Sequence, residues 1–251
     1  MFSLVWAVCF VAANPGSWGP TTRLVFSRQL LFTAVDGLFV SMRIAFAVGV
    51  LTIVQASMWI DSVGASTEDI VPTLWRAVIR EIAPLIACLV VIGRSCIAIS
   101  TELANMLVNG EIEVLETQGI DPMTTQIMPR VLSVTISVFC LSIVVAASMM
   151  CAGFAVGAFA DVIRIPWPMF VETVMRQMSW QDMLFFLPKT FISGAFIGAI
   201  CCHDGLSVRG TLADVPRVTS RSGINAMSAV FGVSAILSLM IYGRFLVFKV
   251  F

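Results

Sequence analysis

The chain has 251 residues, of which 59% are hydrophobic and only 12% are charged. A soluble domain carries about twice that share of charged residues, so this composition excludes a water-soluble fold and indicates an integral membrane protein. The formal net charge is zero and no basic block is present, which argues against nucleic acid as a partner because nothing would neutralise its phosphates.

Residues 1–30 are expected to form an interfacial or elbow segment. The first twelve are apolar but too short to cross about 30 Å of hydrocarbon, and they lack the basic leading region of a signal peptide. Trp6 and Trp18 suit interfacial anchors around a break at Asn14-Pro15-Gly16. We therefore predict a helix that lies in the membrane plane.

Five later stretches approach the roughly 20 apolar residues that a membrane-spanning helix needs. They are Gly37–Ile60, Ile82–Ser100, Val131–Ala160, Met183–Cys202 and Gly223–Gly243. Lys189 lies near one end of the fourth stretch, where we expect its amine to snorkel to water. The chain is thus predicted to be all-α, a single membrane domain over 1–251.

The arginines before the first span and between the last two spans predict that both segments are cytoplasmic. They are Arg23, Arg28, Arg209, Arg217 and Arg221. The connections Asp61–Arg80 and Asp161–Asp182 then face outward. The remaining connection, 101–130, is cytoplasmic by this topology.

Connection 101–130 is unusually acidic for a cytoplasmic loop. Its five acids are Glu102, Glu111, Glu113, Glu116 and Asp121, against the single basic residue Arg130. Ile112 and Leu115 are three positions apart, as on one helix face, and Gly119 and Pro122 are typical of a helix end. These signals predict a short amphipathic helix over Glu111–Gln118 at the cytoplasmic surface.

Charged residues within apolar stretches usually face a partner or a cavity. Arg43, Arg94 and the pair Arg80-Glu81 are the candidates. Neighbouring helical residues point about 100° apart, so we expect Arg80 and Glu81 to meet different neighbours, either a lipid headgroup or, as snorkelling side chains, water. Arg94 is predicted to form a structural contact with Glu102.

The chain lacks the sequence signatures of a P-loop, a G-x-S-x-G elbow and an H-E-x-x-H metal helix. The run Cys201-Cys202-His203-Asp204 carries ligand-type atoms, but adjacent residues do not converge easily on a tetrahedral metal. The seven cysteines lie almost entirely in apolar runs, and we predict no structural disulfide. No catalytic or metal site is therefore assigned. The patterns Gly153–Gly157 and Gly194–Gly198 favour close helix packing, within this chain or between subunits.

A long series of residues, in this order along the chain, is typical of one protein family. Its positions are Arg80, Glu81, Pro84, Gly93, Arg94, Glu102, Leu103, Met106, Glu116, Gly119, Ile120, Asp121, Pro122, Pro129 and Arg130, with a weaker echo at Arg217-Val218-Thr219-Ser220-Arg221. This string resembles the permeases of the MlaE (YrbE) family, membrane subunits of ABC transporters that carry lipids across the Gram-negative envelope.

The resemblance implies a homodimer in the bacterial inner membrane that binds two ATPase subunits, a periplasmic MCE-domain protein and sometimes a STAS-domain protein. ATP and Mg would be bound by the ATPase, and this chain would hold no cofactor. Arg80 and Glu81 would line an outward-facing lipid cavity. Energy would enter through a coupling segment comprising Glu102, Met106, Glu111, Ile112, Leu115, Glu116, Gly119, Asp121 and Pro122.

The sequence departs from the family pattern in three places. Asn109-Gly110-Glu111 stands where T-E-Q is usual, Cys96 and Ala104 replace glycines, and Val215-Pro216 replaces a late glycine. The first departure puts the docking geometry of the coupling helix in question.

The sequence thus predicts the permease subunit of an ABC transporter that moves phospholipid, or a related lipid, between the inner and outer membranes. A stand-alone secondary carrier or channel would instead use an ion-coupling acid within a span, for which Glu81 is the nearest candidate. A membrane-embedded enzyme or an assembly scaffold is the third possibility.

Overall fold

The computed structural model describes residues 2–14, 18–63, 74–160, 163, 165–208 and 211–250. The undescribed residues include Pro15-Gly16, Arg164, Arg209 and residues 64–73 of the predicted connection Asp61–Arg80. The described elements are all helices: α1 (Phe2–Ala13), α2 (Pro20–Leu30), η2 (Leu31–Val35), α3 (Asp36–Val63), η3 (Val78–Ile82), α5 (Ala83–Val91), η4 (Ile92–Cys96), α6 (Ile97–Val108), α7 (Glu111–Thr117), η5 (Met123–Ile127), α8 (Met128–Phe159), α9 (Trp167–Gln177), α10 (Trp180–Gly205), η6 (Leu212–Asp214) and α11 (Val215–Val250).

Five helices are long and apolar enough to cross a membrane, which confirms the predicted all-α fold with five spans. They are Pro20–Met58, Leu74–Val108, Met123–Phe159, Asp182–Gly205 and Val215–Met240. The first covers 39 residues, about 58 Å at about 1.5 Å per residue. It is therefore longer than the hydrocarbon core of about 30 Å, as are the second and third, so these helices extend beyond the predicted apolar stretches.

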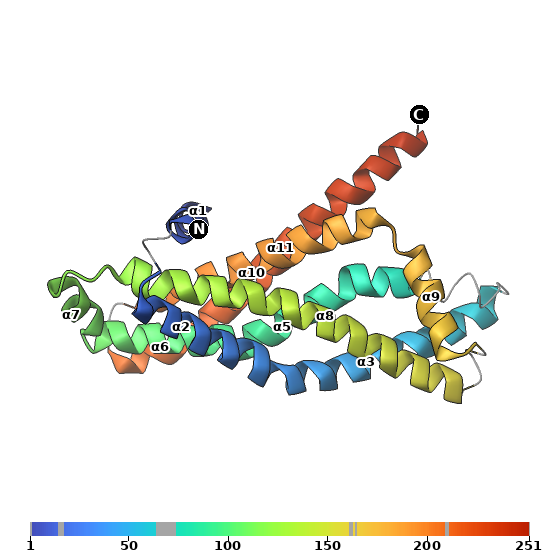
Figure 1. Ribbon diagram of the computed structural model, residues 1–251, viewed down its shortest axis with the longest axis horizontal. Coiled ribbons are helices and arrows are strands. Elements are labelled where there is room, and N and C mark those ends of the chain that lie inside the picture. The colour runs from blue at the N-terminus through green and yellow to red at the C-terminus, as the bar shows by residue number, and fades with distance from the viewer. Residues whose placement is uncertain are drawn as a thin grey trace.

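The N-terminal segment begins with a short separate helix, α1, as predicted, and this helix lies beside the long helices (Figure 1). Val8 of α1 is buried against the bundle, whereas Trp6 is exposed, and Trp18 donates a hydrogen bond from Nε1 to the carbonyl oxygen of Ala12 at 3.0 Å. Residues 20–30 continue through η2 into the first span because nothing in their sequence interrupts the helical backbone.

Helix α8 lies at the centre of the bundle and packs against α2, α3, α5 and α10. Close approach to α10 depends on Gly194 and Gly198, where an added Cβ would lie 2.8 Å from the Cα of Thr135 and 2.9 Å from the Cα of Val131. Gly153 accommodates the ring of Trp75 in the same way, with 2.3 Å to Cζ2. Both glycine patterns therefore serve packing within the chain, one of the two predicted roles.

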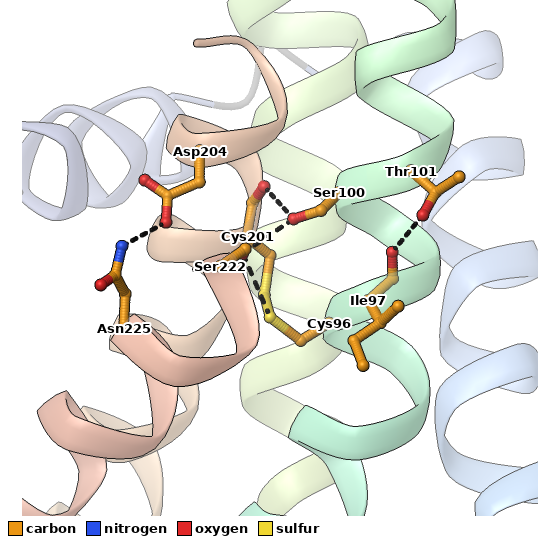
Figure 2. The surroundings of a disulfide bond; sticks show 8 residues. All are labelled: Cys96, Ile97, Ser100, Thr101, Cys201, Asp204, Ser222 and Asn225. Atoms are coloured by element: carbon orange, nitrogen blue, oxygen red, sulfur yellow. Dashed lines mark hydrogen bonds between the residues drawn. A yellow bond between two sulfur atoms is a disulfide. The ribbon is translucent and has the colours of Figure 1, made fainter. Parts of the chain in front are cut away.

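The prediction of no structural disulfide is wrong. Cys96 of η4 and Cys201 of α10 are bonded, with Cα atoms 5.3 Å apart. Figure 2 shows Ser100 and Ser222 beside the bond, with the Ser100 hydroxyl 2.8 Å from both the carbonyl oxygen of Cys201 and the hydroxyl of Ser222. The two cysteines are 105 positions apart, so an apolar context alone did not reveal that their helix faces meet.

The Cys201–Asp204 run serves packing and hydrogen bonding. Asp204 accepts a hydrogen bond from Nδ2 of Asn225 at 2.8 Å (Figure 2) and lies 3.2 Å from Nδ1 of His203. Across the described part of the chain, no group of three or more histidine, cysteine or acidic side chains could hold a metal ion.

Candidate functional site

Arg80 and Glu81 lie on η3, a π-helical turn at the start of the second span. Such single π turns change the direction of the side chains relative to a regular α-helix and are frequent at functional sites. The two side chains turn to different partners on α10, as predicted, although Nε of Arg80 also lies 3.9 Å from Oε1 of Glu81.

Asp182 is the centre of a first group of charged side chains, which includes Arg80. Its Oδ1 accepts a hydrogen bond from Nη1 of Arg80 at 2.9 Å, and its Oδ2 accepts one from Nε of Arg76 at 2.7 Å. The backbone N–H of Ser179 donates a third bond at 2.8 Å. Since the Asp182 side chain is only 2% exposed, these donors replace the water that a buried carboxylate would otherwise need.

Glu81 and Lys189 form a second group of charged side chains beside the first. Nζ of Lys189 donates to Oε2 of Glu81, and the hydroxyl of Ser238 on α11 donates to the same oxygen at 2.9 Å. The Lys189 side chain is only 5% exposed, so the prediction that its amine snorkels to water is wrong. The carboxylate of Glu81 on the neighbouring helix satisfies the amine directly.

The charged cluster is defined as Arg76, Arg80, Glu81, Asp182 and Lys189. Its three cations and two carboxylates leave one positive charge in excess. The guanidinium of Arg80 also lies 5.3 Å from the ring centroid of Phe185, a cation–π contact. The excess charge favours an anionic group at this site.

An apolar cavity of about 220 Å³ adjoins the cluster. Arg76, Arg80 and Asp182 line one part of it. The rest is lined by Ile79, Ile143, Ala146, Ala147, Met150, Met175, Met178, Met183 and Phe186. The flexible methionine side chains can adapt to ligands of irregular shape. The site therefore combines a charged edge with an apolar interior, which suits an amphipathic molecule.

Helix α7 lies at the opposite end of the bundle from α9 (Figure 1). It spans Glu111–Thr117 and confirms the short helix predicted over Glu111–Gln118. Gly110 and Gly119 flank it with φ angles of 75° and 73°, a conformation that glycine adopts without steric cost. The N–H of Gly119 donates to the carbonyl oxygen of Glu116 at 3.0 Å and closes the helix.

Side chains of the predicted coupling segment separate into exposed and internal groups. Glu111 and Glu116 are exposed and Ile112 and Leu115 are half-buried, whereas Met106 packs against the core. Asp121 accepts hydrogen bonds from the backbone N–H of Met123 and the hydroxyl of Thr124 at 3.1 and 2.6 Å. Pro122 follows directly at the entry to η5. Asp121 thus stabilises the entry to the third span.

The predicted contact between Arg94 and Glu102 is wrong. Nη2 of Arg94 pairs with Oδ2 of Asp36 at 3.2 Å, and its guanidinium lies 5.0 Å from the ring centroid of Phe32. Glu102 instead pairs with Nη2 of Arg130 at 2.8 Å. Eight helical residues rise about 12 Å, so partners on neighbouring helices are closer. Arg43 is exposed on α3.

Asp182, Lys189 and Ser238 were not predicted as site residues from the sequence. Together with Arg76, Arg80, Glu81 and the adjoining cavity they form what we call the outer site, after the side of the membrane predicted for it. Asp182 ends the connection predicted over Asp161–Asp182, and Ser238 is an ordinary small residue in a spanning helix. Lys189 carried the one usable signal, because a lysine inside an apolar stretch needs a partner.

The model of the family described as Permease MlaE matches residues 26–240. The chain belongs to the MlaE permease family. A probable ABC transporter permease of Rickettsia typhi is 24% identical over 86% of this chain and 83% of its own length. The intermembrane phospholipid transport system permease protein MlaE of Haemophilus influenzae is 24% identical over 86% of this chain and 79% of its own length. A probable ABC transporter permease protein of Pyropia yezoensis is 25% identical over 87% and 79%, respectively.

Family membership and the five apolar helices identify a multi-pass membrane permease of the ABC transporter class. The residues on which the family resemblance rests include residues at both ends of the molecule. Arg80 and Glu81 belong to the charged cluster near α9, and Glu111 and Glu116 lie on α7.

Proposed function

We propose that this permease moves phospholipid, or a related lipid, between the inner and outer membranes of a bacterium, driven by a separate ATPase subunit. The observation that carries this proposal is the charged cluster beside the apolar cavity. The excess positive charge of the cluster attracts a phosphate, and the methionine-lined cavity accepts part of an acyl chain. The name of the Haemophilus influenzae relative supports the same substrate class.

Energy enters this proposed transporter through α7. ATP and Mg are held by the ATPase, and the exposed Glu116 of α7 contacts it. ATP binding moves α7, and the long second and third spans that flank it transmit the movement to the outer site. Support comes from the exposed position of α7 at the end of the bundle remote from the charged cluster.

A second copy of the chain, an MCE-domain protein and in some systems a STAS-domain protein complete the proposed assembly. In the last span, only 17% of the most apolar stretch of 18 residues is buried, compared with 61% in the second span. We place the partner copy against this open face of α11, which also carries Ser238 of the outer site.

The decisive experiment reconstitutes the permease and its ATPase in proteoliposomes and follows a fluorescent phospholipid. Arg76→Gln removes the half-exposed cation of the cluster, while Arg80 still pairs with Asp182. We expect lipid movement to fall about fivefold, the effect of losing one charge-assisted hydrogen bond to phosphate. The matched control is Arg176→Gln, because Arg176 is 80% exposed and its ion pair among the described residues is with Glu172 on its own helix.

Equal rates for Arg76→Gln and Arg176→Gln would contradict a lipid role for the cluster. Movement driven by an ion gradient without ATP would instead support a secondary carrier. That alternative is disfavoured because Glu81 is already paired with Lys189 and is a poor candidate for an exchangeable proton or ion site.

A further inference from the structure

A second, larger cavity of about 650 Å³ lies at the α7 end of the molecule. Side chains from α2, η2, α6, α7, η5 and α8 line it. It shares no lining residue with the cavity beside the charged cluster. We call it the inner cavity.

The inner cavity is lined by two cations and two acids. Arg28 comes from α2, Arg130 from the start of α8, Glu102 from α6 and Glu111 from α7. Three side-chain amides and apolar residues that include Phe32 and Met106 complete the wall. Balanced opposite charges beside apolar walls complement a zwitterionic amphiphile better than a simple anion, which the acids would repel.

Arg130 supplies a buried group with unused hydrogen-bonding capacity. Its side chain is only 4% exposed, and Nη2 donates to Glu102. Its Nε and Nη1 atoms are buried without a hydrogen-bond partner in the described part of the chain. Unpaired buried donors are costly, and a phosphate oxygen would satisfy them because a guanidinium binds phosphate in a fork.

Arg28 and Glu111 provide a second, open pair of charges. Both side chains are exposed, which shows that the cavity reaches the molecular surface. Neither forms an ion pair with another described residue. A carboxylate such as Glu111 can accept hydrogen bonds from a primary ammonium group, whereas a quaternary ammonium has no N–H to donate.

From this arrangement we propose that the inner cavity binds a zwitterionic phospholipid whose headgroup carries a phosphate and a primary ammonium. The arginines hold the phosphate, Glu111 holds the ammonium, and the lipid links α2 to α7. This inference rests on the proposed function in one respect, the orientation of the permease in the membrane. That orientation places the inner cavity at the cytoplasmic leaflet. The bound lipid acts there as a structural ligand of the coupling segment, separate from the transported molecule.

The test uses the full permease, together with its ATPase, in phosphatidylcholine nanodiscs that contain a photoactivatable phosphatidylethanolamine. Mass spectrometry maps the cross-linked peptides, and we expect label on α2 and α6. Arg28→Gln and Glu111→Gln should each lower that label about fivefold. The matched controls are Arg23→Gln on α2 and Glu113→Gln on α7, because both residues are exposed and neither lines the cavity.

Equal labelling of Arg28→Gln and Arg23→Gln would overturn the proposal. So would stronger labelling by a photoactivatable phosphatidylglycerol, which would indicate a simple anion site, or displacement of the label by inorganic phosphate. Protection of the cavity when the ATPase is present would show that the ATPase occupies it, and would also overturn the proposal.

Arg76→Gln in the charged cluster separates this inference from the proposed function, because the pair between Arg80 and Asp182 stays in place. We expect that variant to lower lipid movement about fivefold while the label on α2 and α6 stays at the wild-type level. Loss of the label as well would show that the lipid belongs to the transport route and would overturn a separate structural site. Wild-type labelling without any lipid movement by the wild-type complex would contradict the proposed function alone.

Discussion

Lys189 of α10 is buried against the carboxylate of Glu81 on η3, 108 positions earlier in the chain. This pair joins the second and fourth spans, and the hydroxyl of Ser238 connects it to the fifth. A buried charge whose partner is removed is much more costly than a missing pair. The outer site thus depends on the simultaneous presence of both charges.

Lys189→Met is therefore predicted to destabilise the permease by about 3 kcal/mol, because it leaves the Glu81 carboxylate without its main partner. The double variant Glu81→Gln/Lys189→Met should recover a large part of that loss. Thermal unfolding of the purified variants in one detergent measures both effects. A double variant that is less stable than Lys189→Met would contradict a direct coupling of the two side chains.

Gly194→Ala should destabilise the contact between α8 and α10. The new Cβ would meet the backbone of Thr135 at 2.8 Å, and overpacking of this kind costs about 1–3 kcal/mol. Gly232→Ala is the matched control, since nothing lies within 4 Å of the Cβ position there. The same unfolding assay should show Gly232→Ala at or slightly above wild-type stability, and equal effects of the two substitutions would contradict the packing role.

Leu115→Pro is predicted to break α7, because proline removes a backbone donor and clashes with the preceding turn at a cost of about 3 kcal/mol. We expect ATP-dependent lipid movement to be lost while the protein remains inserted in the membrane. Both are measured in proteoliposomes, by transport of fluorescent lipid and by resistance to carbonate extraction. Glu113→Ala preserves the helical backbone and should retain transport, and retention by Leu115→Pro would exclude α7 as the coupling element.

The disulfide is tested by maleimide labelling after denaturation in detergent without a reducing agent. Cys96 and Cys201 should remain unlabelled until reductant is added, whereas Cys140 and Cys151 are free cysteines and should react at once. In the Cys96→Ser variant, Cys201 should become reactive without reductant. Labelling of Cys96 in the unreduced wild-type protein would show that the two thiols are not bonded.

The sequence alone determined the features that depend on local patterns. Runs of apolar residues were sufficient for the five spans, because a helix in lipid must satisfy its own backbone and expose apolar side chains. The helix at Glu111–Thr117 was also predictable, since Gly110, Gly119 and the spacing of Ile112 and Leu115 act over only a few residues. The residues shared with the family pattern also identified Arg80 and Glu81 as candidate site residues.

Only the tertiary structure decided which charged and sulfur-containing side chains meet. The sequence predicted that the amine of Lys189 reaches water, whereas in the fold this amine is buried against the carboxylate of Glu81. Arg94 was expected to contact Glu102 but pairs with Asp36, and Cys96 bonds to Cys201. Nearly every position of a spanning helix is apolar, so the sequence period does not reveal which face points inward. Small residues such as Gly194 and the π turns η3 and η4 set that orientation, and with it the composition of the charged cluster.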